Sequence, residues 1–452
     1  MDLSDLFLII PFLVMFVLGL LVPAIIVLSY SRFGAGSALI VGVFIIDALS
    51  MGYGGVSLWF NLFYPDIVLG LIALVVGLRL VFAPDFPKKN RAWMLFCALI
   101  CVSLLTGLVS YGSLAGVQVR PYFYFMVAGS YAMSFAMDER RLRLVFNALA
   151  LTALVFICLS AYRWVVYYTP ISSLLPPGGT YNVDGPIRVI KSGETLVIAQ
   201  VLVAGFFYVG ASQGFTAARL FSPVLFGMVV VLQHRSVWLS ALVGVLTRLL
   251  LGRSKSGSTL SQVFLLVFIV AVTAVPLVVS DKLSGLAQQV EGSAARALAG
   301  QDTTGERLSS WHEIVKKWYG AGVRSIVIGQ SFGSDTSRYV QDSRGETRKI
   351  NYTAHNLYVQ TLFNTGLLGL LAFLAATWYV VGGLYRICRD GRGGTEAEVL
   401  LVLMVMQLAY YVPYGTDYLQ SFLFGIALSY VAGKNAVLRG AGDAKQRRGA
   451  LV

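Results

Sequence analysis

The sequence predicts an all-α fold: a polytopic transmembrane helix bundle of 12–13 spans with one large, partly helical extracytoplasmic loop. Composition gives the first indication. Of the 452 residues, 57% are hydrophobic and only 13% are charged, about half the charged share of a soluble domain. The second indication is that the apolar residues gather in runs long enough to cross a bilayer. One long polar stretch, residues 281–353, interrupts these runs in the last third of the chain.

Thirteen apolar segments are candidate spans, because a helix needs about 20 apolar residues to cross the hydrocarbon core. They are centred on 5–29, 38–58, 66–82, 92–110, 120–137, 144–168, 194–210, 219–233, 236–251, 261–280, 354–383, 397–413 and 417–433. The segments 219–233 and 236–251 are short and nearly continuous, so one of them can be re-entrant, which leaves twelve crossings. The first segment lacks the basic start and cleavage site of a signal peptide, so we expect a retained helix.

Lysine and arginine gather in alternate connections, which places those connections in the cytoplasm and the N-terminus outside. The cytoplasmic set is Arg32; Lys88, Lys89 and Arg91; Arg140, Arg141 and Arg143; Arg248, Arg253 and Lys255; Arg386, Arg389 and Arg392; and the tail from Lys434 to Arg448. The outer connections before residue 281 hold only Arg120, Arg163, Arg188, Lys191 and Arg235. This asymmetry explains the net charge of +13 without a nucleic-acid partner.

The chain therefore divides into four predicted parts. Transmembrane helices with short loops occupy 1–280, an extracytoplasmic (periplasmic) loop with amphipathic helices occupies 281–353, and C-terminal transmembrane helices occupy 354–433. A basic cytoplasmic tail follows at 434–452. The four cysteines lie in or beside apolar segments, so we expect no disulfide and no cysteine metal site in the outer loop.

Two acidic residues fall inside predicted spans. Asp47 lies in the middle of one span, and Glu194 begins another. Carboxylates within a membrane are candidates for function, and interhelical hydrogen bonding explains them equally well.

The outer loop contains two predicted helices. Residues 283–298 have the apolar spacing of an amphipathic helix, and residues 303–319 have it more clearly. Thr303 and Glu306 have the spacing of a capping box at the start of the second helix. Its apolar stripe, which we expect to lie on the outer leaflet, consists of Leu308, Trp311, Ile314, Val315, Trp318 and Tyr319. Residues 329–350 are rich in glycine, serine and charge and are predicted to be a loop.

Arg307 is an exception on this second helix. It follows the same helical line as Trp311, Ile314 and Trp318, so its side chain points towards the lipid or the protein body. An arginine in this position either snorkels to the interface or meets a lipid-borne phosphate.

His355 lies where the chain re-enters the membrane and is one of three histidines, with His234 and His312. We place it in the first turn of a helix whose N-cap is Thr353. A helix N-terminus disfavours imidazolium and favours an anion, so a neutral His355 can accept a proton beside a bound anion. The alternative, a purely structural histidine, stays open.

Further cations are predicted at the same face of the membrane. Arg235 stands in HRSVWLSALVG at the outer junction of two apolar segments, where a charge is costly without a partner. Arg188 and Lys191 lie in a neighbouring outer connection. Together with His355, these residues can form a basic outer pocket around one neutral base.

These residues fit one kind of group transfer. Glycosyltransferases that use nucleotide sugars usually hold a metal with paired carboxylates, and the chain has neither an Asp-x-Asp sequence nor a phosphate-loop motif. A donor used outside the cell arrives activated, as a polyprenyl-diphosphate-linked glycan does. Arginines can stabilise the departing diphosphate while a histidine takes the acceptor hydroxyl's proton, a displacement that inverts the anomeric centre. We expect no cofactor and no metal.

The chain resembles the O-antigen ligase and O-antigen polymerase superfamily. Four motifs carry the resemblance in the family's order: Arg235–Ser236, Arg307-x-x-x-Trp311, Gly329-x-x-x-Gly333, and His355–Asn356 followed by Gly-x-x-Gly. The resemblance implies a metal-independent transferase that uses undecaprenyl-diphosphate glycan, with His355 as the essential histidine and Arg235 and Arg307 as the diphosphate-binding arginines. One departure is that ten spans precede the loop here, where ligases of this family are usually described with nine.

The acceptor is left open by the sequence. It can be lipid A–core for a ligase, a lipid-linked repeat unit for a polymerase, or a protein hydroxyl for an O-oligosaccharyltransferase. Arg188, Lys191 and Asn356 are further candidates for substrate binding. The rival functions are a transporter or lipid flippase, for which the polar residues lie too far towards the outer end, and a non-catalytic scaffold. We expect a multi-pass protein of the bacterial inner membrane, in contact with membrane lipid, whose site faces the periplasm.

Overall fold

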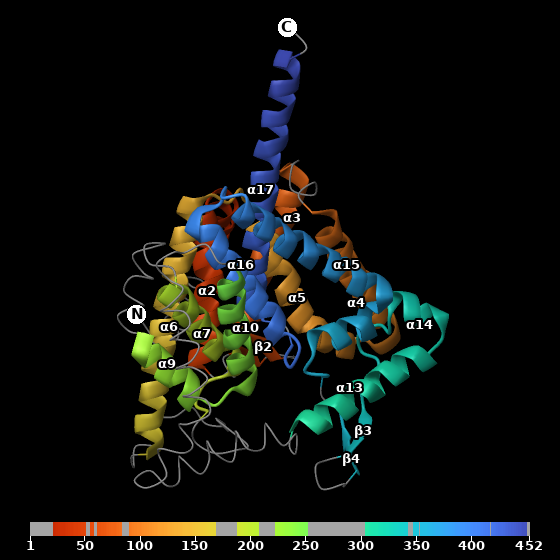
Figure 1. Cartoon of the computed structure of the whole chain (residues 1–452). Helices are drawn as coiled ribbons and strands as arrows, with labels where there is room; N and C mark the ends of the chain where they lie inside the picture. The colour runs from red at the N-terminus through yellow and green to blue at the C-terminus, as the bar shows by residue number, and fades with distance from the viewer. Residues whose placement is uncertain are drawn as a thin grey trace, which may run out of the picture.

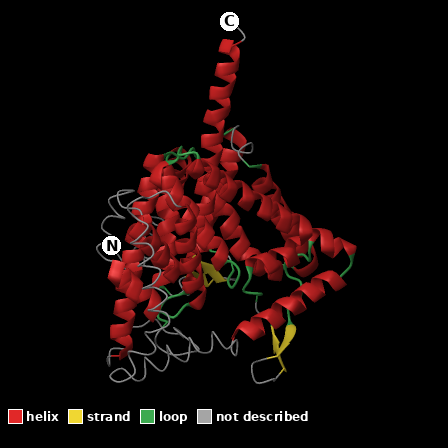
Figure 2. Ribbon diagram, in the orientation of Figure 1, coloured by secondary structure: helices red, strands yellow, loops and turns green. Residues whose placement is uncertain are grey.

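The computed structural model describes residues 21–50, 55–57, 61–83, 90–168, 188–207, 222–251, 303–341, 347–351, 353–415 and 417–449. Its helices are α2 (Phe33–Leu49), α3 (Tyr64–Phe82), α4 (Arg91–Tyr111), α5 (Ser113–Met133), α6 (Glu139–Tyr168), α7 (Ser192–Phe207), α9 (Ser222–Val231), α10 (Arg235–Leu251), α13 (Thr303–Gly320), α14 (Val323–Ile328), α15 (Leu357–Arg389), α16 (Gly394–Tyr410) and α17 (Tyr418–Gly449). The described strands form two antiparallel hairpins, β1 (Gly55–Ser57) with β2 (Asn61–Phe63), and β3 (Arg338–Gln341) with β4 (Thr347–Ile350). The chain is an all-α helix bundle, as its composition predicts (Figure 2).

Four helices in the described part of the chain are long and apolar enough to cross a membrane: α3, α4, α6 over Glu139–Val166, and α15. A fifth candidate is the pair Leu21–Ser31 and Phe33–Leu49, which is bent by 116° and forms either a broken span or a re-entrant loop. The expected twelve or thirteen crossings exceed this number and stay a prediction. The predicted span 261–280 and the predicted helix 283–298 lie outside the described residues.

Helix α9 bears on the uncertain pair of predicted spans. It has ten residues, and at 1.5 Å per residue its length is about 15 Å, roughly half of the hydrocarbon core. As described, it is too short to cross the membrane alone. This length favours the alternative in which 219–233 is not a full crossing.

Helices α5 and α17 meet at the centre of the bundle and approach each other at two glycines. A Cβ atom on Gly425 would lie 2.0 Å from the carbonyl oxygen of Gly129. Small residues at such a contact let membrane helices pack backbone against backbone. Beside the contact, the buried indole of Trp93 donates a hydrogen bond to Ser130 Oγ at 3.0 Å, so this polar group is satisfied within the core.

The two ends of the bundle differ in character. At one end, three cations of the predicted cytoplasmic set pair with glutamates: Arg143 with Glu396 at 2.7 Å, Arg248 with Glu398 at 3.9 Å, and Lys434 with Glu139. Helix α17 projects from this end, whereas α13 and the β3–β4 hairpin lie at the other (Figure 1). This separation agrees with the charge asymmetry of the sequence, and the assignment of the ends to cytoplasm and periplasm stays a prediction.

The structure corrects the predicted span 38–58. Helix α2 ends at Leu49, and residues 55–57 and 61–63 form the β1–β2 hairpin. Glycines at 52, 54 and 55 disfavour continuation of the helix. Asp47 therefore lies near the end of its helix, where Lys191 pairs with it at 3.1 Å, and not in the middle of a span.

The predicted loop 329–350 also needs correction, because it contains the β3–β4 hairpin. Val340 pairs with Arg348, and Arg338 pairs with Ile350. Val340 and Ile350 are buried while Tyr339 is exposed, which is the alternation expected of a strand with one covered face. Only four residues in each strand show this alternation, and the surrounding charges hide it in the sequence.

The glycine motifs join the outer segment to a kink in α15. Gly329 has φ +83° and Gly366, where α15 departs from helical geometry, has φ +65°. A Cβ atom on Gly329 would lie 2.4 Å from the backbone nitrogen of Thr365, and one on Gly366 would lie 2.4 Å from the backbone of Val327. The two backbones also bond directly, since Gln330 N donates to Phe363 O at 2.7 Å. Glycine is therefore needed on both sides of this contact.

Replacing Gly329 by alanine is expected to destabilise the protein by about 2–4 kcal/mol, because a left-handed backbone and a forced contact each cost an L-residue about 1–2 kcal/mol. Thermal unfolding of the detergent-purified protein measures the effect. Gly320→Ala is the matched control, because a Cβ atom there meets nothing within 4 Å. Equal melting temperatures for the two variants would contradict this account of the motif.

Candidate active site at the outer end of the bundle

His355 stands immediately before helix α15 and not within its first turn. The helix begins at Leu357, and its N-cap is Asn356, whose side chain accepts a hydrogen bond from Val359 N at 3.0 Å. The predicted N-cap, Thr353, lies three residues further from the helix. Thr353 and Asn356 are both suitable N-cap residues by sequence. Asn356 is the N-cap because its side chain reaches the free N–H groups at the start of α15.

The backbone of His355 is left-handed, with φ +47°. Few residues other than glycine adopt this conformation, and those that do often lie at functional sites. It is held by its neighbours: Ala354 N donates to Gln360 Oε1 at 3.1 Å, and Leu357 N donates to the carbonyl oxygens of Tyr411 and Tyr414. The imidazole is thus presented, exposed, from a fixed turn at the end of the bundle.

Helix α13 covers this turn. Its bounds agree with the prediction, and its apolar stripe packs on the protein body, where Ile314 and Trp318 bury against Ala354 and Phe363. Trp311 Nε1 donates to Ala354 O at 2.7 Å, directly before His355. The expectation that the whole stripe faces the outer leaflet is corrected: only Leu308 and Tyr319 of this stripe remain exposed.

Arg307 points from α13 towards the body of the protein, as the helical spacing predicts. Its Nη1 donates to Pro413 O at 3.0 Å, and its guanidinium lies 5.2 Å from the ring centroid of Tyr414. The ring of His355 meets the same tyrosine edge to face, with 6.4 Å between centroids. Arg307 and His355 are therefore brought together around Tyr414, although they are 48 positions apart in the sequence.

Arg338 is a second cation near His355, and it was not among the predicted site residues. It is 3% exposed, and its guanidinium donates to Ser310 Oγ at 2.7 Å and to Thr336 O at 2.9 Å. A longer bond, 3.4 Å, reaches Thr353 O. Arg338 thus ties strand β3 to α13 and to the segment before His355. No sequence pattern singles it out, because the hairpin that positions it lies in a segment predicted to be a loop.

The electrostatics of this cluster favour a neutral imidazole. Partial burial lowers the pKa of His355, and the positive charges of Arg307 and Arg338 lower the pKa further. Both effects favour the neutral ring, and the role of His355 as a proton acceptor stays a prediction. The cations now identified act in the same direction as the helix N-terminus.

Arg307→Gln is expected to raise the pKa of His355 towards its usual value of about 6.5, because the variant removes a charge that opposes imidazolium. NMR titration of histidine-labelled protein measures this shift, and the chain has only three histidines to assign. The wild-type ring should protonate at a lower pH than the ring of the variant. A lower pKa of His355 in the variant than in the wild type would contradict the proposed electrostatic effect of Arg307.

Arg235 reaches the same end of the bundle through the pairing of α10 with α16. Ser240 Oγ donates to Met406 O at 2.6 Å, and Arg248 faces Glu398, so the two helices run antiparallel. Arg235, the first residue of α10, consequently lies level with the end of α16 at Tyr410, which leads into Pro413 and Tyr414.

The other polar residues predicted at this end have separate surroundings. His234 Nε2 hydrogen-bonds Ile190 O at 3.0 Å, burial lowers its pKa to about 4, and Arg188 is close enough to lower it further. Arg188 is thus beside the turn that precedes Arg235. Lys191 pairs with Asp47 at 3.1 Å. The side chain of Asn356 is 6% exposed and caps α15, so its structural role is clear.

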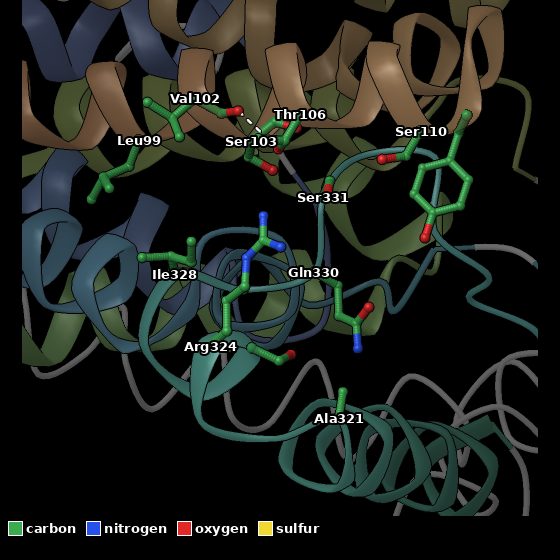
Figure 3. A pocket seen from close by; sticks show the side chains of 13 residues that line it. Leu99, Val102, Ser103, Thr106, Ser110, Ala321, Arg324, Ile328, Gln330 and Ser331 are labelled. Atoms are coloured by element: carbon green, nitrogen blue, oxygen red, sulfur yellow. Dashed lines mark hydrogen bonds between the residues drawn. The ribbon is translucent and has the colours of Figure 1, made fainter.

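A separate cavity of about 270 Å³ lies between α4 and the segment from α14 to Ser331 (Figure 3). Arg324 extends from α14 towards Ser103 and Thr106 of α4, with Gln330 and Ser331 nearby (Figure 3). None of the residues that the sequence identifies as site candidates lines it. It is therefore distinct from the cluster around Tyr414.

Residues 220–374 match the family model described as O-Antigen ligase, Wzy_C. This stretch is thus similar to the O-antigen ligase family. It covers about a third of the chain, from α9 to the middle of α15, and includes Arg235, Arg307 and His355. The resemblance drawn from the four motifs is thereby confirmed. A search of curated proteins gives no match.

The match to the O-antigen ligase model, together with the apolar helices, indicates a multi-pass membrane protein. Arg188 and Lys191 lie before the matched residues, so the domain match gives them no support. The roles of individual residues stay predictions.

Proposed function

We propose that this protein transfers a glycan from undecaprenyl diphosphate to a sugar hydroxyl of an acceptor at the periplasmic face of the bacterial inner membrane. The acceptor is a second glycan or lipid A–core. The observation that supports this proposal most is the placement of a neutral histidine and an arginine around one tyrosine, within and beside the stretch that is similar to the O-antigen ligase family. The reaction proposed needs no metal and inverts the anomeric centre.

His355 is the proposed base. The acceptor oxygen attacks the anomeric carbon, a new carbon–oxygen bond forms, and the bond from that carbon to the diphosphate breaks. The acceptor's proton passes to the imidazole, which is neutral because its pKa is lowered. The electron pair of the broken bond stays on the diphosphate, which leaves attached to its lipid.

Arg307 and Arg235 are proposed to bind that diphosphate. Arg307 uses one N–H group on Pro413 O, and its other N–H groups form no hydrogen bond with residues that the structure describes. An arginine fork fits the paired oxygens of a phosphate, and it is already oriented here by α13. The N-terminus of α15 adds a further preference for an anion at this position.

Reconstituted transfer tests the proposal. The protein is inserted into liposomes with a lipid-linked glycan donor, and released undecaprenyl diphosphate is measured together with the glycan product and its anomeric configuration. We expect release and product in equal amounts, with inversion, and no loss of rate in the presence of EDTA. Movement of the intact lipid-linked glycan across the bilayer without release would favour a flippase instead. Loss of activity with EDTA that Mg²⁺ restores would contradict the metal-independent reaction.

A further inference from the structure

A second cavity lies beside the proposed transfer site, and its lining has a different chemistry. It has a volume of about 300 Å³ and is formed by α2, α5, α7 and the connection from α16 to α17. Three carboxylates, Asp47, Glu194 and Asp417, line it. Aromatic rings make up much of the remaining wall, namely Phe44, Tyr124, Tyr410, Tyr414 and Tyr418.

Tyr418 supplies the observation that points to a ligand. It is 7% exposed, lines the cavity, and its hydroxyl group is buried without a hydrogen-bond partner in the described part of the chain. The ring is held edge to face by Phe44 and Tyr124, with centroids 5.4 Å and 5.8 Å away. A buried hydroxyl without a partner is costly, so its retention suggests a partner that enters the cavity from outside.

Asp417 offers an acceptor next to this hydroxyl. Its Oδ1 caps α17 by accepting from Leu419 N at 2.8 Å, whereas its Oδ2 accepts no hydrogen bond from the described residues. Oδ2 lies over Gly193, where a Cβ atom would come within 2.6 Å, so the glycine keeps this oxygen accessible.

The cavity does not suit an anion or a metal ion. Of the cations in its wall, Lys191 is paired with Asp47 and Arg120 is paired with Asp66 at 3.0 Å, so both already have an anionic partner. No group of three His, Cys, Asp or Glu side chains in the described ranges is arranged to hold a metal ion. Carboxylates beside aromatic rings instead match a ligand with many hydroxyl donors and apolar ring faces.

Tyr414 connects this cavity to the proposed transfer site. Its ring lies under the guanidinium of Arg307 and beside the ring of His355, and it also lines the cavity, stacked on Tyr410 at 5.0 Å between centroids. A ligand in the cavity is therefore next to the groups that would bind a diphosphate and accept a proton.

We propose that this cavity binds an uncharged sugar ring of the glycan substrate, with Tyr418 and Asp417 as hydrogen-bonding partners of its hydroxyl groups and the tyrosines as its walls. The proposal rests on the function proposed above and adds the substrate class: a neutral sugar at this position, with anionic sugars disfavoured because both cations in the wall are already paired. The ring belongs either to the donor glycan or to the acceptor, since both meet at the anomeric carbon.

Saturation-transfer NMR on the full-length protein in detergent tests binding, with N-acetylglucosamine as the neutral probe and glucuronate as the anionic probe. We expect binding of the neutral probe only. Tyr418→Phe should weaken it about tenfold, the loss expected for one hydrogen bond to a buried group. The melting temperature should be unchanged or higher, because the variant removes a hydroxyl without a partner. Tyr385→Phe, at an exposed tyrosine of α15, is the matched control and should change neither.

Two further variants separate this proposal from the proposed reaction. His355→Asn should abolish transfer and leave probe binding intact, so a failure of the catalytic assignment does not affect the binding result. Asp417→Asn should weaken binding as Tyr418→Phe does. Undiminished probe binding in both cavity variants, equal binding of glucuronate, or no probe binding by the wild-type protein would each overturn the proposal.

Transfer kinetics of Tyr418→Phe then identify the ring. A raised KM for the lipid-linked donor assigns the cavity to the sugar beside the diphosphate, and a raised KM for the acceptor assigns it to the acceptor sugar. Either result supports the cavity as a sugar site, and an unchanged KM for both substrates contradicts it.

Discussion

Replacing His355 by asparagine is expected to lower the rate of glycan transfer about 100- to 10,000-fold, the contribution of a positioned general base. Asparagine is the sharper choice than alanine, because it tolerates the left-handed backbone that His355 adopts at φ +47°. The protein should therefore fold and insert normally while lacking a proton acceptor. Glycan products from a strain without the native gene, resolved on a gel beside the amount of membrane-inserted protein, measure the effect.

His312→Asn is the matched control for this experiment. His312 is exposed on α13, more than one helical turn from Arg307. Its side chain faces away from the apolar stripe that packs on the protein body. The control should retain wild-type transfer, which shows that loss of a histidine from the outer segment is tolerated in itself. Normal polysaccharide from His355→Asn at normal protein level would remove His355 from the reaction.

The part of the site that follows helical periodicity could be predicted from the sequence. Arg307 was placed on the inward face of its helix by the spacing to Trp311, Ile314 and Trp318, and the structure has it there, bonded to Pro413. A stripe of this kind repeats every 3.6 residues, so a single charged residue on it is visible without tertiary information. The bounds of α13 were predicted for the same reason.

Short elements and helix ends were predicted less well. The β3–β4 hairpin has four residues in each strand, too few for a period of two to stand out among charges. At the start of α15, Thr353 and Asn356 are both good capping residues, and the choice depends on the contacts of Leu357 with Tyr411 and Tyr414. Asp47 was predicted in the middle of a span, whereas it lies near the end of α2, because the glycines that follow end the helix early.

The residues that complete the site could not be found by pattern, because they come from segments far apart in the chain. Arg338 acts on His355 through a hairpin, and Tyr414 enters from the connection between α16 and α17. Asp417 and Tyr418 become noteworthy only when a cavity and an unsatisfied hydroxyl are seen. Sequence indicated the chemistry of the base and the cation, and tertiary structure added the groups that orient them.

Arg307→Ala is expected to lower transfer about 100- to 1,000-fold, the loss typical when a preorganised donor to a developing negative charge is removed. The departing diphosphate would lose a guanidinium that α13 already holds in place, at 5.2 Å from Tyr414. Arg307→Lys should recover only part of the rate, because the ammonium keeps the charge and lacks the planar fork that meets two phosphate oxygens. Initial rates with reconstituted protein, at varied donor concentration, measure both variants.

Lys316→Ala provides the control for charge removal from the same helix. Its side chain is 71% exposed on the opposite face of α13, where it is 3.9 Å from Glu313, and its loss should leave the rate unchanged. The order wild type, Lys, Ala at position 307 distinguishes diphosphate binding from a structural role. If Arg307 served only to hold the Pro413 segment, both variants would lower the melting temperature in proportion to the rate. Full activity of Arg307→Ala at normal stability would exclude Arg307 from donor binding, and the cationic part of the site would then rest on Arg235 alone.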